Sequence, residues 1–402
     1  MDAEKPIARR TRTSSGLGFT TGRRRFDRMG SGVAADDAST ATRVLFVSTN
    51  RGLGGQPQSL LTLLEHLPST VVARVAAPRG AVTDRAAQLP QVEHVTVLPY
   101  DVGRPRWSRV REALAIAREG WSQRRHLDAI HANGQSELNL VALATLVSSV
   151  PVVMWAHAVE SSPTAGWLRP LWRSLRRRVT WTAVSPTAAT TLASATGTTV
   201  DRIRVVPNPV DPARVVAAPR SHDGVRVGYL GQPFEIKGFP LLGSIIEHVE
   251  RDGVAFDLFL SPPPANLPLE LRPPWDALFA AAEGRQVFLC GQRSDVRRIY
   301  AETDIVLCPS RNESFNRIAV EAMMNGIPVV ATDLPAHRAL LGEEEAGLLF
   351  PVGDAVAGAA AVTRLVDRPE LRQQLGARGR ERAQAYVPEQ IIPLLVSAYR
   401  GG

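Results

Sequence analysis

The chain has 402 residues, which is more than a single compact core usually supports, so two folded domains are expected. Its net charge is +8, and among its 47 Lys plus Arg residues only Lys5 and Lys237 are lysine. No apolar run has transmembrane or signal-peptide character, and Cys290 and Cys308 form neither a disulfide framework nor a metal-ligand spacing. We therefore expect a cytoplasmic protein with buried thiols, no metal and no cofactor.

Residues 1–42 differ from the rest of the chain. They are rich in Arg, Ser, Thr and Gly and have almost no periodic apolar positions, which predicts a disordered basic tail. The alternative interpretation is an electrostatic anchor for nucleic acid or anionic lipid. We expect no nucleic-acid partner.

After the tail, apolar strands alternate with helices, which predicts parallel, doubly wound sheets. The strands expected in the first half are Arg43–Ser48, Val71–Ala76, Val92–Leu98, Asp128–Ala132, Pro151–Ala156, Thr180–Val184 and Ile203–Val206. Those expected in the second half are Arg226–Leu230, Phe256–Leu260, Gln286–Leu289, Asp304–Leu307, Pro328–Ala331 and Gly347–Phe350. The Pro-rich stretch 207–224 divides the halves, so the domains are predicted at 43–212 and 213–385.

The first strand is followed by the glycine-rich stretch TNRGLGGQ, which contains Gly54 and Gly55 and leads into a helix with Pro57 at an early position. A glycine-rich turn at a helix N-terminus suits a phosphate group but also serves as a simple tight turn. The spacing is not GxGxxG, and no Lys-Ser/Thr pair completes a phosphate-binding P-loop.

His157 follows the strand Pro151–Ala156, at what would be the carboxyl edge of a sheet. An isolated histidine is more often structural than catalytic, but the position at a strand end gives the functional interpretation equal weight. Further on, the segment 166–181 places Trp and Leu on one helical face and Arg on the rest. We predict a helix packed on the sheet, with an interfacial membrane helix as the alternative.

Lys237 lies in the stretch 225–249, which has the pattern of a strand, a turn-rich loop, Lys-Gly and an amphipathic helix. Lysine is a compact point charge on a flexible stem, whereas arginine is a planar fork. A lysine at the entrance of a helix is suited to contact a diphosphate. The alternative is an ordinary surface lysine.

The stretch 313–334 carries the strongest functional pattern, ESFNRIAVEAMMNGIPVVATDL. A helix is predicted over 315–325, ended by Gly326, and it joins two buried strands. Glu313 lies where the first strand meets the helix, which is where ligands bind in open α/β sheets. The first amides of this helix, from Phe315 to Arg317, lack intrahelical partners and suit a phosphate. Glu321 lies two turns further along, and either glutamate taken alone could be a solvated surface residue.

Positions 313 to 332 resemble the signature of the large retaining glycosyltransferase family called family 4 or group 1, which has the two-domain GT-B fold. The resemblance implies an α/β architecture of two doubly wound, Rossmann-like domains that face a central cleft. It further implies that Glu313 lies beside the donor sugar and that Glu321 holds the nucleotide ribose. The stretch Ser314, Phe315, Asn316 and Arg317 would hold the diphosphate.

The same resemblance extends to the earlier elements. It implies that Lys237 binds the donor diphosphate and that Gly54 and Gly55 lie near the diphosphate and the acceptor. His157 would contact the donor sugar. Residues 386–402 would form a helix that crosses back onto the first domain.

Two positions depart from the family pattern. Asn316 stands where the family usually has Gly, and asparagine tolerates unusual backbone angles. Gln232 stands where the family has the Arg that pairs with the lysine on the diphosphate. Arg293, Arg311 or Arg317 could replace that missing charge.

The sequence therefore predicts a retaining glycosyltransferase that uses a nucleotide-diphosphate sugar, without a metal ion or a protein nucleophile. The acceptor would be a saccharide, a lipid-linked glycan or a small molecule, with peripheral contact at the inner membrane face if the segment 166–181 binds lipid. The alternatives are a nucleotide-sugar epimerase of the same architecture and a non-catalytic nucleotide-sugar-binding protein.

Overall fold

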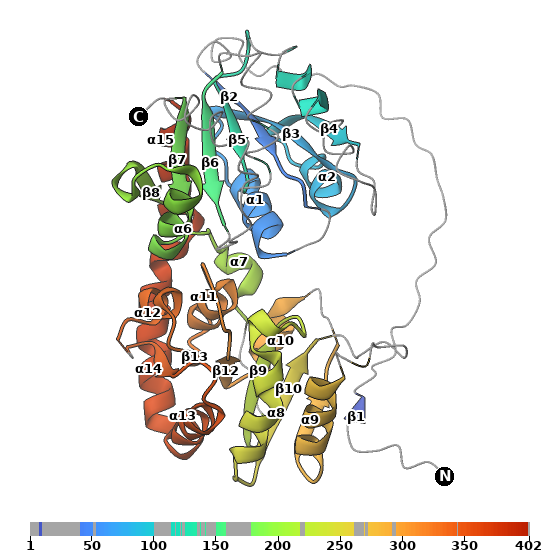
Figure 1. Ribbon diagram of the computed structural model, residues 1–402, viewed down its shortest axis with the longest axis vertical. Coiled ribbons are helices and arrows are strands. Elements are labelled where there is room, and N and C mark those ends of the chain that lie inside the picture. The colour runs from blue at the N-terminus through green and yellow to red at the C-terminus, as the bar shows by residue number, and fades with distance from the viewer. Residues whose placement is uncertain are drawn as a thin grey trace.

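The computed structural model describes residues 8–9, 41–50, 54–99, 114–116, 118–120, 122, 125–134, 137, 141, 150–157, 178–217, 222–260, 269, 272–291, 295–343 and 345–400. They form two lobes, each built on a parallel sheet (Figure 1). Most of the tail 1–42, the greater part of the segment 166–181 and Arg293 lie outside the described residues.

The first lobe contains a seven-stranded sheet in the order β4-β3-β2-β5-β6-β7-β8, and all its pairings are parallel. Its strands are β2 (Thr42–Val47), β3 (Val71–Pro78), β4 (Val92–Leu98), β5 (Ala129–Ala132), β6 (Val152–Ala156), β7 (Val179–Ala183) and β8 (Ile203–Val205). Its central strands β2, β5 and β6 are almost continuous runs of buried apolar residues, as expected for a parallel sheet covered on both faces.

The second lobe contains another seven-stranded parallel sheet, in the order β1-β11-β10-β9-β12-β13-β14. Its strands are β1 (Ala8–Arg9), β9 (Val225–Leu230), β10 (Val254–Phe259), β11 (Gln286–Leu289), β12 (Ile305–Cys308), β13 (Val329–Thr332) and β14 (Gly347–Phe350). These observations confirm the predicted doubly wound, Rossmann-like sheets.

Helices cover the sheets, and caps in the sequence explain several of their ends. The α-helices with described bounds are α1 (Gly55–Glu65), α2 (Ala81–Ala86), α6 (Pro186–Thr196), α7 (Pro212–Val215), α8 (Phe239–His248), α9 (Pro273–Ala282), α10 (Val296–Ala301), α11 (Arg317–Met324), α12 (Pro335–Leu341), α13 (Ala355–Asp367), α14 (Pro369–Ala383) and α15 (Pro388–Tyr399). Short 3-10 turns are η2 (Val200–Arg202), η3 (Glu235–Lys237) and η5 (Gln384–Tyr386). For example, Ser185 caps the start of α6 by accepting from the Ala188 amide, and Gly197 ends it with φ of 72°.

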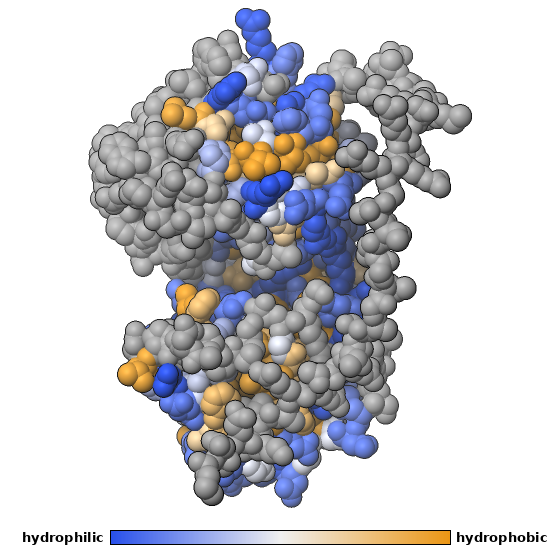
Figure 2. Space-filling view, turned by 90° about the vertical axis from the view of Figure 1, so that its right-hand side faces the viewer, coloured by the Kyte–Doolittle hydropathy of each residue, from blue (hydrophilic) through white to orange (hydrophobic). Residues whose placement is uncertain are grey.

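Each sheet has one point where the strand order reverses. In the first sheet this point lies between β2 and β5, and in the second between β9 and β12. Ligands of open α/β sheets bind in the crevice beyond the carboxyl ends of such strands. Figure 2 shows a waist between the two lobes, where much of the coloured surface is hydrophilic.

The last helix, α15, lies against the first lobe, whereas α13 and α14 cover the second (Figure 1). Its apolar residues Ile391, Leu395 and Tyr399 belong to the same buried cluster as the first sheet. The Tyr399 hydroxyl is 2.8 Å from Nδ1 of His131 in β5. The end of the chain therefore helps to hold the first lobe together.

The structure differs from the sequence predictions at several element ends. Within the tail predicted to be disordered, Ala8 and Arg9 form β1 beside β11, which would otherwise be an edge strand with unpaired backbone groups. Thr42, assigned to the tail, is the first residue of β2. Every predicted strand is present, with its ends moved by at most two residues.

Three further predictions need correction. The helix predicted over 166–181 overlaps β7 at its end, because Val179–Ala183 forms a strand in which Trp181 is buried. The helix predicted over 315–325 is shorter, since it spans Arg317–Met324. Cys308 is buried as expected, but Cys290 is only half-buried. None of the helices that the structure describes is long and apolar enough to cross a membrane.

Candidate functional site

The carboxyl edges of the two sheets meet between the lobes. Ser314, which follows β12 in the second lobe, donates its hydroxyl to the carbonyl oxygen of His157, which follows β6 in the first lobe, at 2.5 Å. The neighbouring Phe315 packs against the buried clusters of both lobes. The loops that carry the predicted site residues therefore touch across the cleft.

Lys237 and Glu313 form the centre of the second-lobe edge. The Lys237 Nζ atom donates to Oε1 of Glu313 at 2.7 Å. The same oxygen accepts the hydroxyl of Ser310 at 3.0 Å. The Glu313 side chain is only 7% exposed, whereas that of Lys237 is 37% exposed. The buried Ser310 hydroxyl therefore binds the Glu313 carboxylate from the protein interior. The more exposed ammonium group of Lys237 binds it from the solvent side.

Gly238 explains why the Lys-Gly pair has this position. Its φ is 71°, a left-handed conformation that favours glycine, and it ends η3 directly before α8. A Cβ atom here would overlap the carbonyl oxygen of Pro309, in the loop after β12. The close approach of these two backbones brings Lys237 beside Glu313.

Lys237 and Glu313 line a cavity of about 20 Å³, together with Tyr229, Cys308 and Asn316 among others. It has room for about one water molecule and is too small for a sugar nucleotide. Burial raises the pKa of the Cys308 thiol to about 12, so this cysteine stays protonated and is not a nucleophile.

Asn316 caps the helix α11. Its side-chain oxygen accepts from the Ala319 amide at 3.1 Å, and its Nδ2 atom lies 2.9 Å from Nε2 of His337. Its φ is −95°, which any residue adopts, so the unusual backbone angles invoked for this position do not occur. Asparagine replaces the family glycine here as a helix cap.

The start of α11 leaves backbone donors free. The amides of Phe315, Asn316 and Arg317 donate to no residue that the structure describes. This is the normal state of the first amides of a helix, and it leaves them available to an anion.

Glu321 lies in α11 and is almost fully engaged. Its Oε1 atom accepts from Nε of Arg317 at 2.7 Å, and its Oε2 atom accepts from the Tyr300 hydroxyl at 2.8 Å. Arg317 also donates to the carbonyl oxygen of Pro209 in the linker between the lobes, at 3.0 Å. The Arg317 side chain is therefore committed to α11 and the linker, and only its amide is free for a phosphate.

Gln232 is exposed and bears no charge, so the second lobe has one cation fewer at this edge than the family pattern implies. Among the described arginines that the sequence offered as replacements, Arg311 is the exposed one. Its guanidinium pairs with Glu235 at 3.0 Å, and its amide donates to the carbonyl oxygen of Ile236, beside Lys237.

His157 lies at the first-lobe edge and is 8% exposed. Its Nε2 atom is 3.1 Å from Oδ1 of Asn133, which follows β5. Burial and the nearby His131 lower the pKa of His157 to about 3, and the neighbouring Asn208 side chain opposes this shift. The ring is neutral at pH 7, so it can supply hydrogen bonds but no positive charge.

Gly54 and Gly55 begin α1, with Gly54 as the N-cap at φ of −90°. A Cβ atom on Gly55 would meet nothing within 4 Å, and one on Gly54 would meet only Pro57 at 3.9 Å. Neither backbone angle nor packing within the described residues requires glycine here. As far as the described residues show, the space in front of the two glycines is open.

The sequence analysis missed four polar residues at this edge, namely Thr49, Gln56, Asn133 and Glu137. They are joined by hydrogen bonds, and Asn133 connects them to His157. Asn133 and Glu137 follow β5 as His157 follows β6, so their position at a strand's carboxyl end was a signal that could have identified them.

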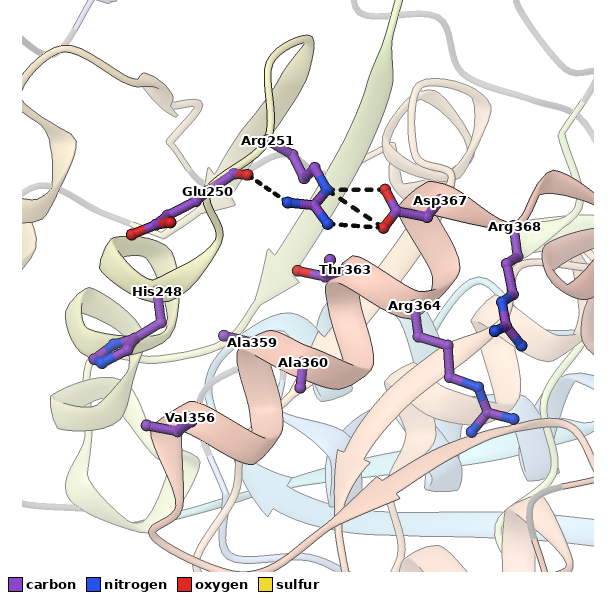
Figure 3. Close-up of a pocket in the computed structure, with 10 residues that line it drawn as sticks. All are labelled: His248, Glu250, Arg251, Val356, Ala359, Ala360, Thr363, Arg364, Asp367 and Arg368. Carbon is purple, nitrogen blue, oxygen red and sulfur yellow. Dashed lines mark hydrogen bonds and ion pairs between the residues drawn. The ribbon is translucent and has the colours of Figure 1, made fainter.

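A larger groove of about 420 Å³ lies elsewhere, between the end of α8 and the outer face of α13 (Figure 3). Ala359, Ala360 and Thr363 form its floor, and the Arg251 guanidinium is held by Asp367 at its end. None of the predicted site residues lines this groove. Within the described part of the chain, no group of three or more His, Cys, Asp or Glu residues is placed to hold a metal ion.

Two family models match the chain. One, described as glycosyl transferases group 1, matches residues 224–368, and the other, glycosyltransferase family 4, matches residues 53–214. The phosphatidyl-myo-inositol mannosyltransferase of Mycolicibacterium smegmatis is 31% identical over 283 residues, which cover 66% of this chain and 69% of the relative. The D-inositol 3-phosphate glycosyltransferase of Saccharomonospora viridis is 37% identical over 106 residues, so the match spans only 25% of that relative and 26% of this chain.

The fold is similar to that of solved structures. Anabaena Alr3699/HepE, solved in complex with UDP and glucose, has a TM-score of 0.74 and 20% identity, over 90% of this chain and all of that one. The sucrose-phosphate synthase of Thermosynechococcus elongatus has a TM-score of 0.72 and 19% identity, over 90% of this chain and 98% of that one. At this identity the likeness concerns the fold alone.

Proposed function

We propose that this chain transfers a sugar from a nucleoside diphosphate sugar to an acceptor hydroxyl, with retention of the anomeric configuration. The chain belongs to the group 1 and family 4 glycosyltransferases, and the proposal rests on that membership. The observation that carries this proposal is the ion pair between Lys237 and Glu313. It brings together a cation and a carboxylate from two separate motifs, at the strand reversal point of the second sheet, where ligands of such sheets bind.

The leaving group of this reaction is a nucleoside diphosphate, which gains negative charge as the bond to the sugar breaks. Lys237 and the free amides of Phe315, Asn316 and Arg317 provide positive potential at the cleft before the reaction starts. Groups that are already oriented toward developing charge stabilise a transition state most effectively. Arg311, whose amide bonds to Ile236 beside Lys237, would add a second charge where Gln232 provides none if it leaves Glu235.

Glu313 would lie against the donor sugar, and Glu321 would accept the ribose hydroxyls. Each Glu321 oxygen already accepts one hydrogen bond, and a carboxylate oxygen can accept another. In the first lobe, the open space at Gly54 and Gly55 permits close approach by the donor or the acceptor.

The acceptor hydroxyl must lose a proton during transfer. We propose that the leaving phosphate accepts this proton on the same face of the sugar, so no protein nucleophile is assigned. The neutral ring of His157 would then orient a sugar hydroxyl through a hydrogen bond. Two relatives are named for inositol-based acceptors, so inositol phosphates and phosphatidylinositol are the first acceptors to test.

The experiment is a thermal-shift screen with UDP, GDP and ADP sugars, followed by mass spectrometry of reactions with inositol, inositol phosphate and phosphatidylinositol vesicles. A donor present at a hundredfold excess over its Kd should stabilise the fold by about 2.7 kcal/mol. We expect one nucleotide class to stabilise the protein and its sugar to appear on an acceptor. Binding without transfer to any acceptor would indicate a non-catalytic binder, and sugar isomerisation without an acceptor would indicate an epimerase.

A further inference from the structure

Glu137 is a buried carboxylate that the proposed reaction does not use. It is 1% exposed and lies beyond β5, at the strand reversal point of the first sheet. Its Oε1 atom accepts from the Thr49 amide and the Thr49 hydroxyl, both at 2.9 Å, and from Nε2 of Gln56 at 3.3 Å. These donors come from the two ends of the glycine-rich connection between β2 and α1.

The connection continues from Glu137 to His157. Gln56 donates its Nε2 to the carbonyl oxygen of Asn133, and Asn133 returns a bond from its Nδ2 to the Gln56 carbonyl oxygen at 3.5 Å. The Asn133 Oδ1 atom lies 3.1 Å from Nε2 of His157. One polar chain therefore joins the glycine-rich connection to the predicted sugar-contacting histidine.

The hydrogen-bonded side chains of Gln56 and Glu137 are closely packed around Gly134. Gly134 has φ of 147°, and a Cβ atom on it would overlap the Gln56 side chain and lie 2.6 Å from Oε2 of Glu137. The position thus requires glycine so that the two polar side chains can meet. A carboxylate packed this closely cannot shift without moving its donors.

The hydrogen bonds indicate which form of Glu137 is stabilised. Three donors converge on one oxygen, an arrangement that favours the ionised, acceptor-only carboxylate. Burial raises the pKa of Glu137, and the bonds from Thr49 and Gln56 oppose that rise. Removing the carboxylate would leave the part-buried Thr49 and Gln56 donors without this acceptor.

We propose that Glu137 is a positioning residue for the transfer reaction. It fixes Thr49 and Gln56, which flank the connection between β2 and α1, and, through Gln56 and Asn133, the ring of His157. These side chains are then held in one arrangement on the side of the first lobe where the acceptor must align with the donor sugar. This inference rests on the proposed function, since it assigns the residue a part in the same transfer.

The test compares Glu137→Ala and Glu137→Gln with Asp257→Asn as a matched control. Asp257 is an equally buried carboxylate, 1% exposed, but it pairs with Arg226 in the second sheet, away from the first-lobe network. Glutamine keeps an oxygen acceptor for the Thr49 and Gln56 donors, whereas alanine removes it. A fourth variant, Gln56→Ala, removes the side chain that links Glu137 to Asn133 and leaves Glu137 in place. It keeps the test decisive if Glu137→Ala does not fold.

We expect Glu137→Ala and Gln56→Ala to raise the KM for the acceptor or lower kcat by about tenfold or more. The Kd for the nucleoside diphosphate should change less than threefold, because most of its predicted contacts, namely Lys237, the first amides of α11 and Glu321, lie in the second lobe. Glu137→Gln should recover most of the lost activity. Asp257→Asn should lower the Tm without changing the KM for the acceptor.

Hydrogen–deuterium exchange provides a readout that does not depend on turnover. The Thr49 amide, which donates to Glu137, should exchange faster in Glu137→Ala than in Asp257→Asn. Unchanged exchange together with unchanged kinetics would overturn the proposal, and so would equal kinetic losses in the Glu137→Ala and Asp257→Asn variants. If the wild-type protein transfers no sugar but Thr49 exchange accelerates, the proposed function fails while the structural connection from Glu137 stands.

Discussion

Lys237 Nζ and Glu313 Oε1 lie 2.7 Å apart, although 76 positions separate the two residues in the sequence. They meet because β9 and β12 are neighbours at the strand reversal point of the second sheet. An incoming diphosphate must therefore compete with Glu313 for the lysine. Glu313 would keep the lysine oriented until the donor arrives.

Lys237→Ala should lower turnover by about 10²–10³ or more, because removal of one preorganised contact to developing charge has that effect. Lys237→Arg should recover only part of the activity, since a planar fork does not replace a point charge. Gln232→Arg should be tolerated or should tighten donor binding. Steady-state kinetics and nucleotide Kd for the three variants measure this. Near-wild-type turnover in Lys237→Ala would mean that other groups, such as Arg311, hold the phosphates.

Glu321→Ala should weaken nucleotide binding, whereas Glu313→Gln should mainly lower turnover. The physical reason is their position, since Glu313 lies at the mouth of α11 and Glu321 lies inside it against Tyr300 and Arg317. Calorimetric titration with the nucleoside diphosphate and initial rates separate the two effects. Small and equal effects of both variants on binding and rate would refute the assignment.

Gly238→Ala should destabilise the fold more than Gly253→Ala does. Both glycines have left-handed backbones, with φ of 71° and 74°, but only Gly238 lies against the Pro309 carbonyl, and a Cβ atom on Gly253 would meet nothing within 4 Å. We expect a loss of about 1–2 kcal/mol in Gly253→Ala and about 2–5 kcal/mol in Gly238→Ala. Chemical denaturation measures both, and equal losses would show that the loop after β12 can move away.

Acidification below pH 6.5 should destabilise the protein. Burial lowers the pKa values of His131 and His157 to about 3, so the unfolded chain binds protons in the range from about pH 6.5 to 3 that the folded chain does not. Stability therefore falls as the pH falls, by up to about 1.4 kcal/mol per pH unit for each such histidine. Glu137 has a raised pKa and contributes in the opposite direction near pH 4.5 and above.

The corresponding measurement is the free energy of unfolding between pH 7 and pH 4.5 in the wild type and in His131→Phe. The replacement fits the aromatic surroundings of Phe46, Trp155 and Tyr399, so its main effect on the slope should be the loss of one titrating group. We expect a flatter slope in the variant. Identical slopes would show that His131 is accessible to protons in the folded protein.

The sequence was most informative where local patterns and strand-end positions agree. Glu313 and His157 could be proposed because each follows a buried strand, and Lys237 because it is a rare lysine at the entrance of a helix. The structure places all three at carboxyl edges that meet in the cleft. The fold follows from the alternation of strands and helices. The two-residue strand β1 was not predictable, because Ala8–Arg9 has no pattern and pairs only because an edge of β11 is available.

The partners within the site were beyond the reach of the sequence. Nothing local pairs Glu137 with Thr49, since the two are 88 positions apart and meet only when β2 and β5 become neighbours. At Asn316 the sequence led to a wrong expectation. Its comparison with the family glycine suggested an unusual backbone, whereas the structure shows an ordinary one and a helix cap that contacts His337.

The central claim is that the cleft at Lys237 and Glu313 transfers a sugar from a nucleoside diphosphate donor with retention. The most direct test follows the anomeric proton of the product by NMR, with the preferred donor and an acceptor, in the wild type and in Lys237→Ala. We predict that the wild type forms a product with the anomeric configuration of the donor, and that Lys237→Ala forms little or none in the same time. A product of inverted configuration, or equal product formation by the variant, would contradict the account.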